Sequence, residues 1–179
     1  MSKAIRNLSN WRPNEEEWDR LFEEIKNQSD RGAGIVAGSF LDATLQLALH
    51  SYFAAEPARE LLENIGGALS TFSSRIIVGA ALGLYSPAIR KRIDTIRHIR
   101  NAFAHTLKPI GFDEPAIADA CAGLPLLDVR GSTPPVPTDW SDARQRYVGT
   151  CYRHGHDLVG LAIKYGGREI TVEIDENGD

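Results

Sequence analysis

Residues 30–55, DRGAGIVAGSFLDATLQLALHSYFAA, decide the fold of this chain. Large apolar residues recur there at the three- and four-residue spacing of a helix, and they leave little polar surface. These residues are Ile35, Val36, Phe40, Leu41, Leu45, Leu49, Tyr52 and Phe53. A helix that is apolar around most of its circumference must be covered on several sides. We therefore expect this helix at the centre of a helical bundle.

Further helices are predicted on both sides of the central stretch. Asn14 and Glu17 resemble a capping box at the start of NEEEWDRLFEEI, and Ser86–Pro87 places a proline at a first helical position. Other start signals are Pro57, Ser70 or Thr71, and Ser141, a short helix is expected over EPAIADACAGL, and stop signals are Gly66–Gly67, Gly83, Pro109 with Gly111, and Gly166–Gly167. Helical patterns thus occupy most of the chain and predict an all-α fold.

Two segments break the helical pattern. Residues 123–139, GLPLLDVRGSTPPVPTD, are rich in proline and predict a long loop. In the tail, residues 167–179, the alternation of Ile170, Val172 and Ile174 is typical of a strand, which would be frayed or paired with another strand. We find no repeat and no linker. We expect one domain over residues 1–179, with its core at about 14–166.

The composition bounds the function. The formal net charge is −4 and the isoelectric point is about 5.7, which argues against a protein that coats nucleic acid. No apolar run is long enough to cross a membrane, and the N-terminus lacks the apolar segment of a signal peptide. Cys121 and Cys151 are then expected as free thiols in a reducing compartment. We expect a cytoplasmic protein without a cofactor.

Positive charge is concentrated in one segment, Ser86–His105. It contains Asp94 and five cations, which are Arg90, Lys91, Arg92, Arg97 and Arg100. The segment therefore carries +4, and the rest of the chain carries −8. Two interpretations stay open: a local site for an anion, or an internal ion-pair partner for the acidic run NEEEWDRLFEEI.

Residues 97–105, RHIRNAFAH, carry the candidate site. Arg97, Asn101 and His105 are spaced four residues apart and form one stripe, flanked by Arg100 on one side and by His98 on the other. We expect these polar groups on a face distinct from the apolar stripe, which consists of Ile89, Ile93, Ile96, Ile99 and Phe103. Arginine can hold a phosphate, and histidine can act as a general acid or base. The alternative is a solvated helix end whose cations favour the helix dipole.

Two other groups have a functional and a structural interpretation. Asp42 either lies on the exposed edge of the central helix or orients an arginine of the basic helix. Cys151, His154 and His156 are close in sequence, but a closed zinc site needs about four ligands and these three align poorly on a helix. We therefore expect no metal site.

The segment RNAFAH has the R-x4-H pattern of the HEPN superfamily, whose members are helical and in many cases metal-independent ribonucleases. A longer ordered set resembles the mannitol operon repressor (MltR-like) family over about residues 29–127, and the final helix also fits. The set consists of DRGAGIVAGSFLDATLQLAL, TFSSRIIVGAALGLYS, IRHIRNAFAH and ADACAGLPL. The resemblance implies a HEPN-like helical bundle.

The HEPN resemblance also implies a homodimer in which Arg100 and His105 of two chains line one cleft. Arg100 would hold a phosphate, His105 would transfer a proton, and Asn101 would position either group. Arg97, His98 and Asp42 are the further candidates for binding.

The MltR-like resemblance implies a transcriptional regulator of a sugar-alcohol operon. The chain has neither a helix-turn-helix signature nor an overall basic charge, so we expect regulation through a protein partner rather than by direct base reading. The alternative is a metal-independent endoribonuclease that uses the R-x4-H motif on RNA.

Overall fold

The computed structural model describes residues 15–53, 61–62, 66–126 and 141–165. Over these ranges the regular secondary structure is entirely α-helical, which confirms the predicted all-α class. The helices are α2 (Glu15–Lys26), α3 (Asp30–Tyr52), α5 (Phe72–Ala81), α6 (Pro87–His105), α7 (Pro115–Ala122) and α8 (Asp142–Tyr165). The expected cap at Asn14, the helix start at Pro57, most of the Pro-rich loop and the strand-like tail lie outside the described residues.

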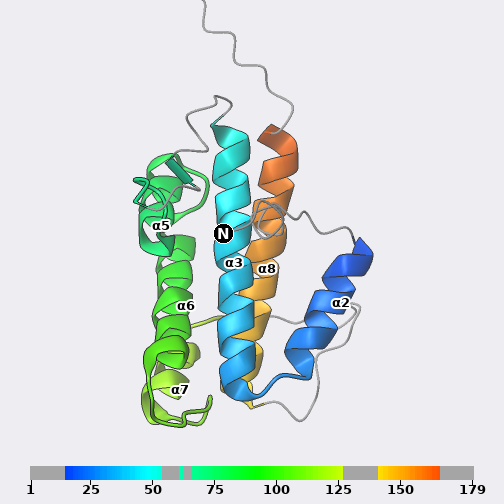
Figure 1. The fold of residues 1–179 in the computed structure, drawn as a ribbon, viewed down its shortest axis with the longest axis vertical. Coiled ribbons are helices and arrows are strands. Elements are labelled where there is room, and N and C mark those ends of the chain that lie inside the picture. Colours follow the sequence, from blue (N-terminus) through cyan, green and yellow to red (C-terminus); the bar gives the residue numbers. More distant parts are fainter. Residues whose placement is uncertain (1–14, 54–60, 63–65, 127–140, 166–179) are drawn as a thin grey trace, which may run out of the picture.

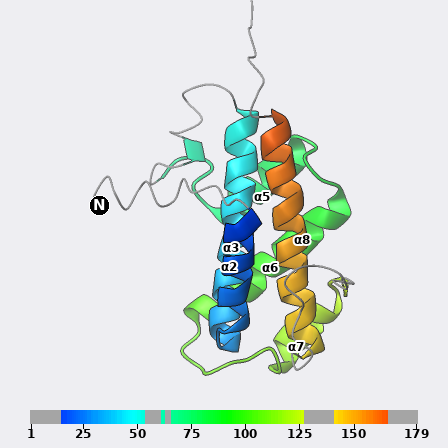
Figure 2. The ribbon, with the colours of Figure 1, turned by 90° about the vertical axis from the view of Figure 1, so that its right-hand side faces the viewer.

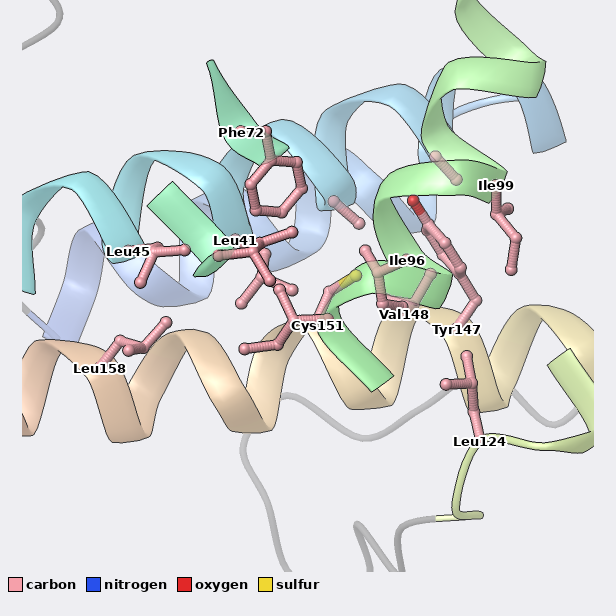
Figure 3. Packing of buried hydrophobic residues seen from close by; sticks show 14 of the residues in the cluster. Leu41, Leu45, Phe72, Ile96, Ile99, Leu124, Tyr147, Val148, Cys151 and Leu158 are labelled. Atoms are coloured by element: carbon pink, nitrogen blue, oxygen red, sulfur yellow. The ribbon is translucent and has the colours of Figure 1, made fainter. Parts of the chain in front are cut away.

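Helix α3 lies at the centre of the bundle, as its apolar sequence predicts. It runs side by side with α8, while α6 lies on one side of it and α2 on the other (Figure 1). A view turned by 90° shows α2 in front of α3 and α6 behind it (Figure 2). Leu41 and Leu45 of α3 meet Val148, Cys151 and Leu158 of α8 in a shared core (Figure 3).

Local capping signals place the helix starts. Thr71, one of the two residues expected to start α5, accepts a hydrogen bond from the backbone N–H of Ser74. Ser86 accepts from the N–H of Ile89, with Pro87 at the first helical position, as expected. Gly83 has a φ of +70°, so the chain leaves α5 through the left-handed region that glycine tolerates.

Two glycines of α3 set its distance from α6 and α8. The Phe103 ring packs directly on Gly34, where a β-carbon would overlap it. At Gly38, a β-carbon would lie 2.6 Å from the Tyr147 hydroxyl and 2.7 Å from the β-carbon of Arg100. The Tyr147 hydroxyl also donates a 2.8 Å hydrogen bond to the Gly34 carbonyl. Helices α3, α6 and α8 therefore meet at Gly34 and Gly38, where α3 has no side chains.

One arginine connects three helices at the end of the bundle where α2 ends and α3 and α8 begin. Buried Arg144 of α8 forms a 3.0 Å ion pair with Asp30, the first residue of α3. Its Nη2 also donates to the carbonyls of Ile25, Lys26 and Gln28, at the end of α2. Carbonyls in the last turn of a helix lack intrahelical partners, so Arg144 satisfies them while it joins α2, α3 and α8.

Helix α3 is also long and apolar enough, by length and composition alone, to cross a membrane. The expectation that no apolar run reaches that length was therefore wrong. The core helix of a soluble bundle passes the same test, because it needs apolar residues on several faces. Half of the apolar window in α3 is buried inside the bundle.

Candidate functional site

The exposed side of α6 is strongly basic. Arg90, Lys91, His98 and His105 are exposed there, whereas Ile93, Ile96, Ile99 and Phe103 are buried on the opposite side, as the spacing predicts. Among the described residues, Arg97 is the one arginine or lysine of α6 that pairs with a carboxylate, at 2.9 Å from Asp94. The positive charge of the helix is therefore largely uncompensated within the described part of the chain.

The acidic N-terminal run does not supply the missing negative charge. Helix α2 packs against α3, and its Phe22 ring meets Tyr152 of α8, on the side of α3 away from α6 (Figures 1 and 2). The described residues of α2 and α6 do not touch. The interpretation of this run as an internal ion-pair partner of α6 was therefore wrong, because the apolar side of α2 directs it to the opposite face of the bundle.

Arg97 and His98 form a local cluster on the exposed face. Arg97 Nε pairs with Asp94, and Arg97 Nη2 lies 2.7 Å from His98 Nε2. An arginine can only donate, so this contact requires His98 Nε2 to act as the acceptor. The Arg97 side chain is 18% exposed and that of His98 is 67% exposed, so His98 is the more accessible of the two.

Arg100 does not lie on the exposed face. Its β- and γ-carbons pack over Gly38 of α3, and the side chain is half-buried. On the helical wheel it falls between Ile93 and Ile96, within the apolar sector. The expectation that all polar groups share a face distinct from the core was wrong for Arg100. The long aliphatic stem explains the difference, because it can cover apolar surface while the guanidinium reaches a polar edge.

The guanidinium of Arg100 orients Asn101. Arg100 Nη1 donates a 3.1 Å hydrogen bond to Asn101 Oδ1, which leaves the Asn101 amide nitrogen as a donor. Arg100 Nε is buried and has no hydrogen-bond partner among the described residues. Arg100 and Asn101 therefore present donors rather than acceptors, which suits a carboxylate or a phosphate.

His105 is separated from Arg100 on the helix. It is the last residue of α6 and is exposed, followed by Thr106 at the C-cap. Five residues correspond to a rotation of about 140°, so the two side chains leave α6 in different directions. A single chain thus does not bring Arg100 and His105 together, and a joint site would need a second copy.

Asp42 contacts a different arginine from the one expected. Its Oδ1 accepts from Arg75 Nε at 2.9 Å and from Arg75 Nη2 at 2.7 Å, and Arg75 belongs to α5. Burial raises the pKa of Asp42, while the positive charges of Arg75 and, more weakly, Arg100 act in the opposite direction. Of the two interpretations of Asp42, the contact with an arginine of the basic helix is therefore wrong, and so is the exposed edge, because the side chain is only 18% exposed. The sequence feature that points to Arg75 is a charged residue within the otherwise apolar run TFSSRIIVGAAL.

The Cys151, His154 and His156 group is dispersed around α8. Cys151 and His154 are buried, while His156 is exposed. Burial raises the pKa of the Cys151 thiol and lowers the pKa of His154. In the part of the chain that the structure describes, no three histidine, cysteine or acidic side chains gather as metal ligands.

Comparison of the chain with models of known families, with curated proteins and with solved structures found no match. The resemblance to the MltR-like family and to the HEPN superfamily stays a prediction drawn from the motifs. The geometry of α6 is therefore the basis for a functional proposal.

Proposed function

We propose that this protein is a cytoplasmic regulatory protein, similar to the MltR-like family, that binds an acidic protein partner through α6. The supporting observation is the positive charge on the exposed side of that helix. Arg90 and Lys91 are exposed and have no carboxylate partner among the described residues. Arg100 and Asn101 add hydrogen-bond donors that fit a carboxylate.

The charge distribution favours a protein partner over a long nucleic acid. Residues outside the basic segment carry −8, which would repel a polyanion that extends beyond α6. An acidic patch on a protein can contact α6 alone. Regulation through such a partner also needs no base-reading element in this chain.

A metal-independent ribonuclease is the second candidate. It is favoured by the donor pair Arg100 and Asn101, which fits a phosphate, and by the exposed imidazole of His105. Arg100 and His105 diverge within one chain, so this activity would require a dimer that joins the arginine of one copy to the histidine of another.

Binding to two anionic probes tests the proposed function. A labelled polyglutamate peptide and a labelled single-stranded RNA are titrated with the protein, and fluorescence anisotropy is recorded. We expect the peptide to bind, and Arg90→Glu/Lys91→Glu to weaken it by roughly tenfold, since two favourable charge contacts become repulsive.

The matched control changes the charge by the same amount elsewhere. Arg153→Glu/Lys164→Glu reverses two exposed cations of α8, and it should leave peptide binding near the wild-type level. The proposal is overturned if both double variants weaken the peptide equally. RNA that binds more tightly than the peptide, with the same dependence on Arg90 and Lys91, would favour the ribonuclease.

A further inference from the structure

Two helices of opposite charge lie on opposite sides of the bundle. Helix α2 contains six acidic and two basic residues, a formal charge of −4, and α6 contains five basic and one acidic residue, a formal charge of +4. The described residues of the two helices do not touch, because α3 lies between them (Figures 1 and 2). Their charges therefore do not neutralise each other by direct contact within one chain.

The packing of α2 leaves an acidic side exposed. Phe22 and Ile25 are buried, and the Phe22 ring meets Tyr152 of α8 edge-on, with centroids 5.2 Å apart. Arg144 holds the carbonyls at the end of the helix. Glu23 and Glu24, in contrast, are exposed, and Glu23 also pairs with Lys26 of the same helix at 2.6 Å. The apolar side of α2 is thus already occupied, and its acidic residues Glu23 and Glu24 face solvent.

We propose that two copies of this chain associate head to tail, with the acidic side of α2 in one copy on the basic side of α6 in the next. A two-fold contact between α6 helices would instead place two basic sides against each other. Helix α2 lies on the far side of each copy and would not bridge such a contact. A head-to-tail contact is heterologous, so it leaves one acidic and one basic side free for further copies.

This contact goes beyond the proposed function and needs only the two charged sides. It occupies the surface of α6 assigned above to an acidic partner, so self-association and partner binding exclude one another. Exposed ion pairs are weak and screened by salt. The association is therefore weak and salt-sensitive, and an acidic partner displaces it.

Light scattering and sedimentation at two salt concentrations test the contact. At roughly 100 μM protein and about 0.1 M salt, the average mass should exceed the 19.7 kDa of one chain. At about 1 M salt the Debye length falls to roughly 3 Å, and the mass should return to 19.7 kDa. Glu23→Lys/Glu24→Lys and Arg90→Glu/Lys91→Glu should each remain monomeric at low salt.

The decisive control combines all four substitutions in one chain. This chain has the same net charge as the wild type, −4, but α2 and α6 each fall to a formal charge of zero. It should stay monomeric at low salt, whereas an equimolar mixture of the two double variants should associate, because one variant keeps the acidic α2 and the other keeps the basic α6. Circular dichroism verifies that every variant is folded.

Three results would overturn the proposed contact. They are a wild-type chain that stays at 19.7 kDa, a dimer that persists in high salt, and a folded four-substitution chain that self-associates like the wild type. Polyglutamate binding separates this inference from the proposed function. A wild type that binds the peptide without self-associating removes only the head-to-tail contact. Salt-sensitive self-association without peptide binding would refute only the proposed binding of an acidic protein partner.

Discussion

Arginine side chains satisfy backbone carbonyls at helix ends in this bundle and connect those ends to other helices. Arg144 joins Asp30 to three carbonyls at the end of α2. Arg31 donates in the same way to the carbonyls of Thr106 and Lys108, just beyond α6. A guanidinium has five donors in a fixed plane, so one side chain can satisfy several carbonyls that no helix can pair. These contacts connect residues far apart in the sequence.

Replacement of Arg144 should destabilise the fold strongly. Arg144→Met keeps an apolar side chain in place but removes the donor from Asp30 Oδ1 and from the carbonyls of Lys26 and Gln28. We expect the free energy of unfolding to fall by about 3 kcal/mol in urea denaturation. Arg153→Met is the control on the same helix, because its ion pair with Asp157 is solvent-exposed and should contribute less than about 1 kcal/mol. Equal losses in the two variants would contradict the role of Arg144.

His154 should make stability depend on pH. Neither of its ring nitrogens has a hydrogen bond in the described structure, and Asp157 lies 3.8 Å away, outside hydrogen-bonding distance. Burial lowers the pKa of His154 below its ordinary 6.5, the charges of Arg92 and Arg153 act in the same direction, and Asp157 opposes them. The unfolded chain therefore takes up the proton first, and stability is lost as the pH falls from 6.5 through the folded pKa.

A variant without this imidazole provides the measurement. We expect the free energy of unfolding of His154→Gln to change less between about pH 7 and pH 5 than that of the wild type. His156→Gln, an exposed histidine two residues away, should retain the wild-type dependence. A comparison of variants cancels the contribution of Asp42, whose pKa is raised in both chains. The same pH dependence in all three proteins would refute this assignment.

At the scale of the elements, close contact of α3 with its neighbours depends on missing side chains. Gly38→Ala would put a methyl group against the Arg100 β-carbon, which is attached to the backbone of α6 and has little freedom to move. We expect a loss of about 1–3 kcal/mol in thermal or urea unfolding. Gly160→Ala is the matched control, because no atom lies within 4 Å of its added methyl, and better helix propensity should stabilise α8 by up to about 1 kcal/mol. A neutral Gly38→Ala would show that the helices can separate without cost.

For the whole molecule, the divergence of Arg100 and His105 predicts that a single chain does not cut RNA. Purified protein should leave single-stranded and structured RNA intact, both in EDTA and with magnesium. His105→Ala should keep the wild-type melting temperature, since the side chain is exposed at the end of α6. Cleavage that resists EDTA and disappears in both Arg100→Ala and His105→Ala would instead favour the ribonuclease and a shared site between copies.

The sequence by itself determined the helices and the centre of the fold. Caps such as Thr71 and Ser86 act on backbone groups three residues away, and the apolar spacing of α6 depends on the geometry of one helix. The concentration of positive charge in α6 was equally predictable, because the net charge of a segment follows from its residue types alone. These features are local, so neighbouring residues are sufficient to predict them.

Only the tertiary structure decided which charged groups meet. Asp42 pairs with Arg75 rather than with α6, and Arg100 turns its stem toward Gly38. The acidic α2 lies away from the basic α6 because its apolar residues pack on α3 and α8. Apolar burial is the dominant favourable term in folding and is non-directional, so it determines the positions of the helices, and ion pairs form where that packing brings charges together. The partners of the charged side chains follow from that packing, and the spacing of residues in the sequence does not predict it.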